Sequence, residues 1–79
     1  MITDSEREHL VVGYKQVLKA VKNNTCIKLF IAEDCSDGLS SNLRSAADGI
    51  ETVSVPTMRE LGEACGIDVP SSCAAVIRL

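Results

Sequence analysis

Short apolar runs alternate with segments of helical periodicity along this sequence, and that alternation limits the possible folds more than any other feature. The run at 26–32 is almost continuously apolar, which is typical of a strand covered on both faces. Helices that alternate with buried strands predict an α/β protein, a compact three-layer α/β/α sandwich with one central sheet. The strands are expected at 9–12, 26–32, 52–55 and 73–77.

Capping signals mark the expected helix ends. Thr3 and Glu6 have the spacing of a capping box, and the same two residue types recur at 57 and 60, which predicts a helix start at each place. Two asparagines are expected to end a helix at 15–23, and Gly49 and Gly66 to end two later helices. The buried stripes expected on the three longer helices are Val17, Ala20 and Val21, then Leu39, Leu43, Ala46 and Ala47, then Leu61, Ala64 and Cys65.

Length and composition restrict the class of protein. With 79 residues, 46% of them apolar and 24% charged, we expect a single globular domain over 1–79. No apolar run reaches the roughly 20 residues of a bilayer span, and the first residues do not resemble a signal peptide. The four cysteines form no C-x-x-C pair and the only histidine is His9. We therefore expect no metal site, no cofactor and a reduced, cytoplasmic protein, monomeric because no long apolar stripe is exposed.

Charge is distributed unevenly along the chain. The stretch at 13–28 contains four lysines and no acid, so it carries +4, whereas the remaining residues carry −7, from four arginines against eleven acids. The net charge of −3 taken alone argues against nucleic acid as a partner. A local basic patch on an acidic body nevertheless marks that patch as a candidate site for an anionic partner.

An enzymatic function has little support in the residues. Glu33, Asp34 and Asp37 crowd the end of the second predicted strand, a common place for sites in α/β proteins, but they lack the spacing of a calcium loop. We interpret Asp37 as the cap of the following helix and the other two as solvated. His9 and a cysteine could form a nucleophilic pair, yet no third group is evident that would orient them. Since the sequence also lacks a phosphate-binding glycine loop, we expect no catalysis.

The segment after the first predicted strand has the features of an anion-binding site. Gly13 stands between a strand and a helix, where it lets another backbone approach closely. The next three residues occupy a helix N-terminus, whose free N–H groups favour phosphate. Gln16 can both donate to and accept from a base edge, and Lys15, Lys19 and Lys22 share one face of the helix. A solvated lysine face opposite a core stripe is the alternative interpretation.

The loop predicted at 67–72 is more apolar than most connections. Ile67 could pack back on the helix that Gly66 ends. Alternatively, Ile67, Val69 and Pro70 could form an exposed apolar lip for unstacked bases or for a partner. The local pattern leaves both interpretations open.

Three motifs occur in a set order and spacing: Gly13-x-Lys15-Gln16-x-x-Lys19, Ile31-Ala32-Glu33-Asp34 and Leu61-Gly62-x-x-x-Gly66-Ile67-x-Val69. Together they resemble the kink-turn-binding ribosomal protein family, the L-seven-Ae and L-thirty-e superfamily, and in particular its small stand-alone bacterial members. The resemblance covers nearly the whole chain, and the third motif with the Ala-rich strand after it is the most specific part. It implies an α/β/α sandwich around a four-stranded mixed sheet.

The resemblance also implies a partner. Such proteins bind the kink-turn, a sharply bent RNA element with tandem sheared G·A pairs, so the implied partner is structured RNA, either ribosomal RNA or an mRNA leader. By position, Gln16 and Lys19 would contact the guanines of those pairs, and Lys22 would extend the basic face. Contacts to the phosphate backbone or to neighbouring base edges would come from Gly13, Tyr14 and Lys15. The loop packed on extruded nucleotides would comprise Ile67, Asp68, Val69, Pro70 and Ser71.

Some members of the superfamily are protein-interaction modules, which is the second hypothesis for this chain. Such a module would use its acidic surface on basic partners and would have no reason to keep a basic face at 13–22. We therefore favour an RNA-binding protein, associated with the ribosome or another ribonucleoprotein, over a protein-interaction module.

Overall fold

The structure, a computed structural model, describes residues 2–78. Helices and strands alternate within that range as the sequence predicts, and the boundaries of β1, α2 and β3 differ from the expected ones by a single residue. The helices are α1 (Asp4–Arg7), α2 (Tyr14–Lys22), α3 (Asp37–Ala46) and α4 (Met58–Cys65). The strands are β1 (Leu10–Val12), β2 (Cys26–Ala32), β3 (Glu51–Val55) and β4 (Cys73–Ile77).

The strands form one sheet in the order β1-β4-β2-β3. β2 is central: it pairs with β3 in parallel and with β4 in antiparallel orientation. β4 also pairs antiparallel with β1, so β1 and β3 are the edges. This arrangement confirms the four-stranded mixed sheet implied by the family resemblance.

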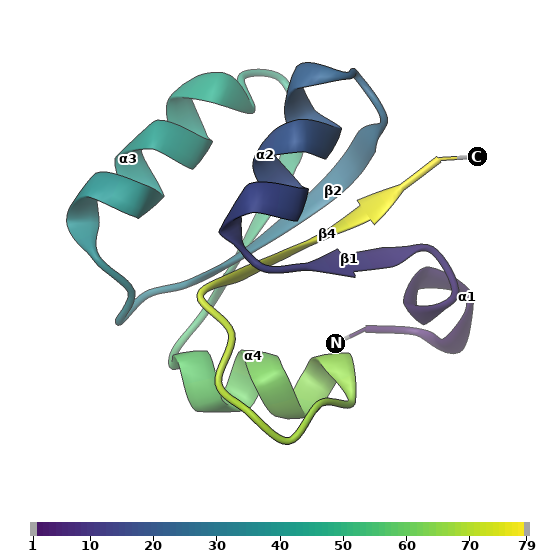
Figure 1. The fold of residues 1–79 in the computed structure, drawn as a ribbon, viewed down its shortest axis with the longest axis vertical. Helices are drawn as coiled ribbons and strands as arrows, with labels where there is room; N and C mark the ends of the chain where they lie inside the picture. The colour runs from purple at the N-terminus through teal and green to yellow at the C-terminus, as the bar shows by residue number, and fades with distance from the viewer. Residues whose placement is uncertain (1, 79) are drawn as a thin grey trace.

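Helices cover both faces of the sheet (Figure 1). α2 and α3 lie next to each other on one face, whereas α4 lies on the opposite face and the short α1 lies beside the start of β1. The expected three-layer α/β/α sandwich is thereby confirmed. Among residues 2–78, no helix has the length and apolar character needed to span a bilayer.

The core sits where β2 passes between the two helix layers. Its last four residues, from Leu29 to Ala32, are completely buried, as a strand covered on both faces requires. The first part of β2 differs from the prediction, because Ile27 is 52% exposed beside an irregularity in the pairing with β4. The largest completely buried side chains are Phe30, Leu29, Ile31, Leu43, Leu61, Val17, Val55 and Cys73.

The predicted caps of α1 and α4 are present, whereas α3 ends at the C-cap Ala47 and not at the predicted Gly49. The Thr3 hydroxyl accepts from the Glu6 N–H, and the Glu6 carboxylate accepts from the Thr3 N–H in return. The α4 cap at Thr57 accepts from the N–H three residues later. Gly66 ends α4 in the left-handed conformation with φ 79°, and Asn24 adopts φ 59° just after α2. Local capping chemistry therefore accounts for these ends.

Three helix details differ from the prediction. Ala46 is exposed, because the buried stripe of α3 runs along the i, i+4 spacing of Leu43 and Ala47 and excludes the last helical residue. Ala64 is only half-buried, while Gly62 takes the inner position on α4. Asp37 lies in the first turn of α3, and the cap is Ser36, whose hydroxyl accepts from the Leu39 N–H.

Polar contacts attach α1 to the rest of the molecule. Lys28 on β2 forms an ion pair with Glu6 at 3.1 Å and a longer one with Glu51 at 3.6 Å. The Arg7 Nη2 donates to the Ala64 carbonyl at the end of α4, at 3.3 Å. A four-residue helix with no buried residue depends on such contacts, because it has little apolar surface to bury.

Candidate nucleic-acid interface

The start of α2 leaves its backbone N–H groups without a side-chain partner. Its N-cap is Gly13, with φ 101° and ψ 150°, a conformation that only glycine adopts readily. The first turn contains no acid, whereas α1, α3 and α4 each have a capping hydroxyl and an acid in the first turn. A helix start of this kind, with its positive dipole end uncompensated, is suited to an anion.

The exposed face of α2 is cationic. Lys15, Gln16, Lys19 and Lys22 are exposed, opposite the buried stripe that the sequence predicts. Within residues 2–78, none of these three lysines forms an ion pair. Their ammonium groups are therefore available to a ligand.

Two shallow hollows flank this face. Gln16 and Lys19 line the first, whose floor includes Val11 and Ile77 from the neighbouring strands. The three lysines line the second, together with Leu18 and Asn23. Gln16 thus shares one hollow with apolar strand residues, and Lys19 lines both hollows, an arrangement suited to a base edge next to a phosphate backbone. The Tyr14 side chain is half-buried and packs against the core.

The loop between α4 and β4 combines the two behaviours that the sequence left open. Ile67 is partly buried and packs against the core, as expected of a residue that follows a helix-ending glycine. Asp68, Val69 and Pro70 are exposed, and 61% of Val69 is accessible. The apolar lip therefore consists of Val69 and Pro70, anchored by Ile67.

Close packing holds this loop against α4. The Val69 carbonyl lies directly over Gly62, so that a Cβ at position 62 would overlap its oxygen and lie 3.2 Å from the Pro70 Cα. At the far end, the Ser71 N–H donates to the Met58 carbonyl at 3.0 Å. Sequence reasoning included Gly62 in a motif without a physical role for it. A glycine inside a helix is the signal that could have indicated a close backbone approach.

A single carbonyl joins the loop to the start of α2. The Cys73 carbonyl accepts from the Gly13 N–H at 3.2 Å and from the Ser71 Oγ at 2.7 Å. Ser71 is only 5% exposed, so its hydroxyl positions the loop and is not presented at the surface. Two segments that are far apart in the sequence thus meet at one edge of the molecule.

The carboxylates after β2 include a second anchor. The Asp34 Oδ1 accepts from the Met58 N–H at 2.7 Å and so holds the start of α4. This contact corrects the prediction that Asp34 is merely solvated. The sequence could not indicate it, because the two residues come from different elements.

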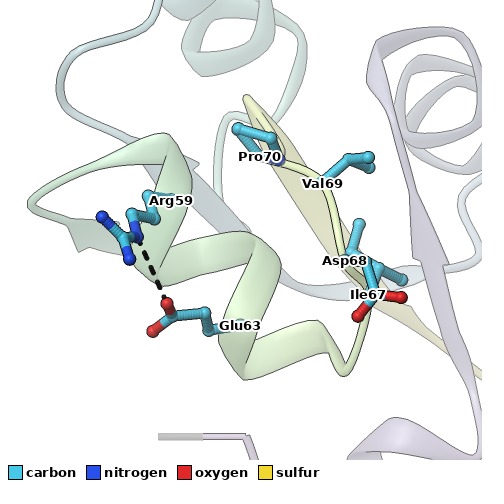
Figure 2. A pocket seen from close by; sticks show the side chains of 6 residues that line it. All are labelled: Arg59, Glu63, Ile67, Asp68, Val69 and Pro70. Atoms are coloured by element: carbon cyan, nitrogen blue, oxygen red, sulfur yellow. Dashed lines mark ion pairs between the residues drawn. The ribbon is translucent and has the colours of Figure 1, made fainter.

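The outer side of α4 and the loop enclose a further hollow (Figure 2). Arg59 and Glu63 project from α4 on one side, and the loop backbone with Pro70 lies on the other. The Arg59 Nε lies 3.4 Å from the Glu63 Oε1, and both side chains are largely exposed. Sequence reasoning did not single out these two residues.

The cysteines offer no activated nucleophile. All four are free and buried, and burial raises the pKa of each thiol: Cys26, Cys35, Cys65 and Cys73. A raised thiol pKa lowers the fraction of reactive thiolate. Among residues 2–78, no three His, Cys, Asp or Glu side chains are grouped so that they could hold a metal ion.

Proteins with similar sequences and structures are named for RNA binding and for the ribosome. An RNA-binding protein of Caldanaerobacter subterraneus is 43% identical over 67 residues, which are 82% of this chain and 82% of that protein. The large ribosomal subunit protein eL8 of Halobacterium salinarum is 38% identical over 68 residues, 82% of this chain and 57% of its own length. The structure of the Giardia lamblia 15.5kD RNA binding protein aligns with a TM-score of 0.79 and 25% identity, over 91% of this chain and 62% of the other.

A family model extends this similarity to nearly the whole chain. The model of the ribosomal protein L7Ae/L30e/S12e/Gadd45 family matches residues 3–79. The resemblance derived from the three motifs is confirmed, and membership in a family of ribosomal and RNA-binding proteins supports the prediction of a non-enzymatic protein. The chain belongs to the ribosomal protein L7Ae/L30e/S12e/Gadd45 family.

Proposed function

We propose that this protein binds structured RNA and that its specific target is the kink-turn. The observation that carries the proposal is the meeting of an uncapped, cationic helix start and an apolar loop at the Cys73 carbonyl. The names of the relatives support RNA as the ligand, and the pairing of a phosphate-binding and a base-covering surface supports a bent RNA.

Each part of this surface has a role in the proposed complex. The N–H groups after Gly13 and the ammonium groups of Lys15, Lys19 and Lys22 contact phosphates. Gln16 and Lys19 read the guanine edges of the G·A pairs, beside the hollow they share. Tyr14 supports the helix start from the core side.

The loop residues differ in their proposed roles. Val69 and Pro70 pack on unstacked nucleotides, because they are the exposed apolar residues there, and Asp68 lies at their edge. Ile67 and Ser71 position the loop from beneath, through core packing and the bond to Cys73.

The RNA conformation is part of the proposed mechanism. A protein that touches both sides of a bend binds the kinked conformer better than the extended one, so it shifts the population of RNA states toward the kink. Few cations imply few released counterions, hence a shallow dependence of affinity on salt. We further propose a cytoplasmic monomer that acts within the ribosome or another ribonucleoprotein.

The test is a titration of the protein into a short kink-turn RNA labelled at both ends, with bending followed by energy transfer. In the control RNA, Watson–Crick pairs replace the G·A pairs. We expect binding and bending with the first RNA and about tenfold weaker binding by Lys19→Ala, since a hydrogen bond to a charged group contributes roughly 1.5 kcal/mol or more. Arg44→Ala is the control for loss of one positive charge, because Arg44 lies on α3, where it donates to Ser40 and Ser54, and not on α2 or the loop.

Equal affinity for both RNAs would contradict the kink-turn proposal. Absence of binding to either near physiological salt would favour the second hypothesis, a module that contacts basic proteins. In that case, a pull-down with the intact chain would come next.

A further inference from the structure

The strand β3 forms the edge of the sheet opposite to the edge from which the proposed RNA surface begins. The strand order is β1-β4-β2-β3, and Gly13 comes directly after β1 at the other edge. Three strand spacings of about 4.8 Å each, or roughly 14 Å, separate the two edges. A ligand that lies along β3 would therefore leave the proposed RNA surface free.

Backbone hydrogen bonds determine which groups of β3 face away from the sheet. The Val55 carbonyl accepts from the Glu33 N–H at 2.7 Å, so the backbone groups of Val55 point toward β2. In a strand paired in parallel, the N–H and C=O of one residue point to the same side, and that side alternates along the strand. The N–H and C=O groups of Thr52 and Ser54 therefore point outward. Within residues 2–78, no hydrogen bond reaches these four groups.

This edge lacks most of the features that protect exposed strands. Protein edges are commonly blocked by charged side chains, proline, a bulge or a covering element. Apart from Glu51 at its start, β3 has no charged residue and no proline, and its register with β2 is regular. Arg44 of α3 reaches the strand, but its Nη2 donates to the Ser54 hydroxyl and not to the backbone. The outer edge of β3 is therefore open to one further strand.

The side chains of β3 indicate which strand would fit there. Cross-strand neighbours share a face of the sheet, and the register places Glu51 beside Lys28 and Val53 beside Phe30. On this face the Glu51 side chain is 67% exposed and Val53 is half-buried. An added strand would therefore fit best with a cation beside Glu51 and, two positions away, an apolar residue beside Val53.

The charges around this edge also favour a basic partner. Asp48, shortly before β3, and Glu33, bonded to its last residue, are exposed and form no ion pair within the described part of the chain. With Glu51 they make three carboxylates, against the cations Arg44 and Lys28, and Lys28 is already paired. An edge of this charge attracts a basic segment and repels RNA or a second copy of this acidic chain.

We propose that the outer edge of β3 binds an extended, basic segment of a partner protein, which adds a fifth strand to the sheet. The backbone of the segment pairs with the outward groups of Thr52 and Ser54. The segment places a lysine or arginine beside Glu51 and an apolar side chain beside Val53. Because β1 and β3 are opposite edges, the protein can hold this segment and RNA at the same time.

The probe for the test is a fluorescent peptide with the core Lys-Thr-Val-Thr-Lys, whose lysines and valine share one face when the peptide is extended. We expect binding, measured by fluorescence anisotropy, and slower hydrogen exchange at the Thr52 and Ser54 amides, which become bonded. Only alternate amides of a strand face its neighbour. N-methylation of one alternate set of peptide amides should therefore abolish binding, whereas methylation of the other set should be tolerated.

Protein variants separate backbone pairing from charge. Ser54→Pro removes an outward N–H and no bond to β2, and it should weaken peptide binding about tenfold. Ser54→Ala is the matched control, because it also loses the bond to Arg44 but keeps the N–H, so it should bind as wild type does. Glu51→Gln should weaken binding about threefold, whereas Glu63→Gln, which removes the same charge from α4, should have no effect.

Urea denaturation establishes that each variant folds, and the two N-methylated peptides decide the question if Ser54→Pro does not. Absence of peptide binding to wild type would overturn the inference. So would equal binding of the two N-methylated peptides, because attraction by charge alone does not depend on which amides are free. A dimer in sedimentation analysis that Ser54→Pro dissociates would assign the edge to a second copy instead. Competition between the peptide and kink-turn RNA would also contradict binding at opposite edges.

Discussion

The start of α2 and the loop after α4 form one surface, but they are built in opposite ways. At the helix start, local partners are missing: Gly13 has no side chain to cap the helix, and the three lysines of α2 form no ion pair among residues 2–78. In the loop, such partners are present: the backbone contacts Gly62 and Met58, and the Ser71 hydroxyl donates to the Cys73 carbonyl. The first region offers unsatisfied charge, and the second offers a fixed shape.

Because of this difference, substitutions in the two regions should have different effects on stability and on RNA binding. Exposed lysines contribute little to folding, so their replacement should affect binding alone. Loop residues that fix the backbone should affect stability and binding together, because a displaced loop no longer matches a bent RNA. Substitutions in the two regions can therefore be told apart by measuring unfolding and binding on the same variants.

Gly62→Ala should have the largest effect. Its Cβ would overlap the Val69 carbonyl, so the loop must move, at a cost of about 3 kcal/mol in the free energy of unfolding. Urea denaturation measures that cost, and RNA affinity should also fall. Gly38→Ala is the matched control, because Gly38 is likewise helical but has open space around it and should gain up to about 1 kcal/mol. Equal stabilities of the two variants would contradict a loop held by close packing.

Gly13→Ala tests the helix start. Position 13 has open space for a Cβ, so any loss would come from the backbone conformation at φ 101° and not from a clash. We expect a loss of about 2 kcal/mol in urea denaturation and weaker RNA binding, since relief of the strain would displace the first turn of α2. Unchanged stability together with unchanged binding would show that this turn does not need a glycine.

Ser71→Ala examines the link between the regions and should have a smaller effect. The variant loses the 2.7 Å bond to the Cys73 carbonyl, but that carbonyl keeps the Gly13 N–H, so the expected cost is about 1 kcal/mol. Thermal unfolding would measure it against Ser72→Ala, whose hydroxyl makes only a 3.8 Å contact with a sulfur. A loss no greater than that of Ser72→Ala would mean that the hydroxyl does not position the loop.

The smallest effect is expected outside both regions, at Glu6. Its pKa lies below the ordinary value of 4.5, first because its carboxylate accepts from the Thr3 backbone and second because of Lys28. A lowered pKa in the folded state stabilises the protein above the unfolded pKa, and this contribution is lost as the pH falls through the folded pKa. The free energy of unfolding, measured with urea, should therefore fall less steeply between about pH 6 and pH 3 for Glu6→Gln than for wild type. If the free energies of unfolding of the two proteins fell in parallel with pH, Glu6 would make no such contribution. RNA affinity at neutral pH should be the same for both.

Much of the fold could be predicted because its signals are local. The signals of the capping box at Thr3, the cap at Thr57, the left-handed Gly66 and the apolar run of β2 each lie within a few neighbouring residues. The family resemblance supplied the mixed sheet, which periodicity does not specify, since a strand pattern carries no information about direction. The errors at Ala46 and Ala64 arose where a helical stripe allows more than one width.

The candidate site was predictable only in part, for a related reason. The cationic face of α2 follows from helical spacing, and its structure agrees with the expected exposure. The anchors of the loop could not be predicted, because Asp34 holds the start of α4 and Ser71 bonds a carbonyl that also serves Gly13. The Asp34–Met58 and Gly13–Cys73 contacts join elements that the sequence does not place beside one another, and the local Ser71 bond depends on the position of that same Cys73 carbonyl.

By itself, the sequence determined where helices and strands begin, which faces are apolar and where the lysines gather, because capping and periodicity act between residues a few positions apart. Only the tertiary structure decided that the segments after Gly13 and before Cys73 form one surface. Antiparallel pairing of β1 with β4 brings the end of one strand to the start of the other. The Cys73 carbonyl then joins the helix start to the loop, a contact that exists only once the sheet has formed.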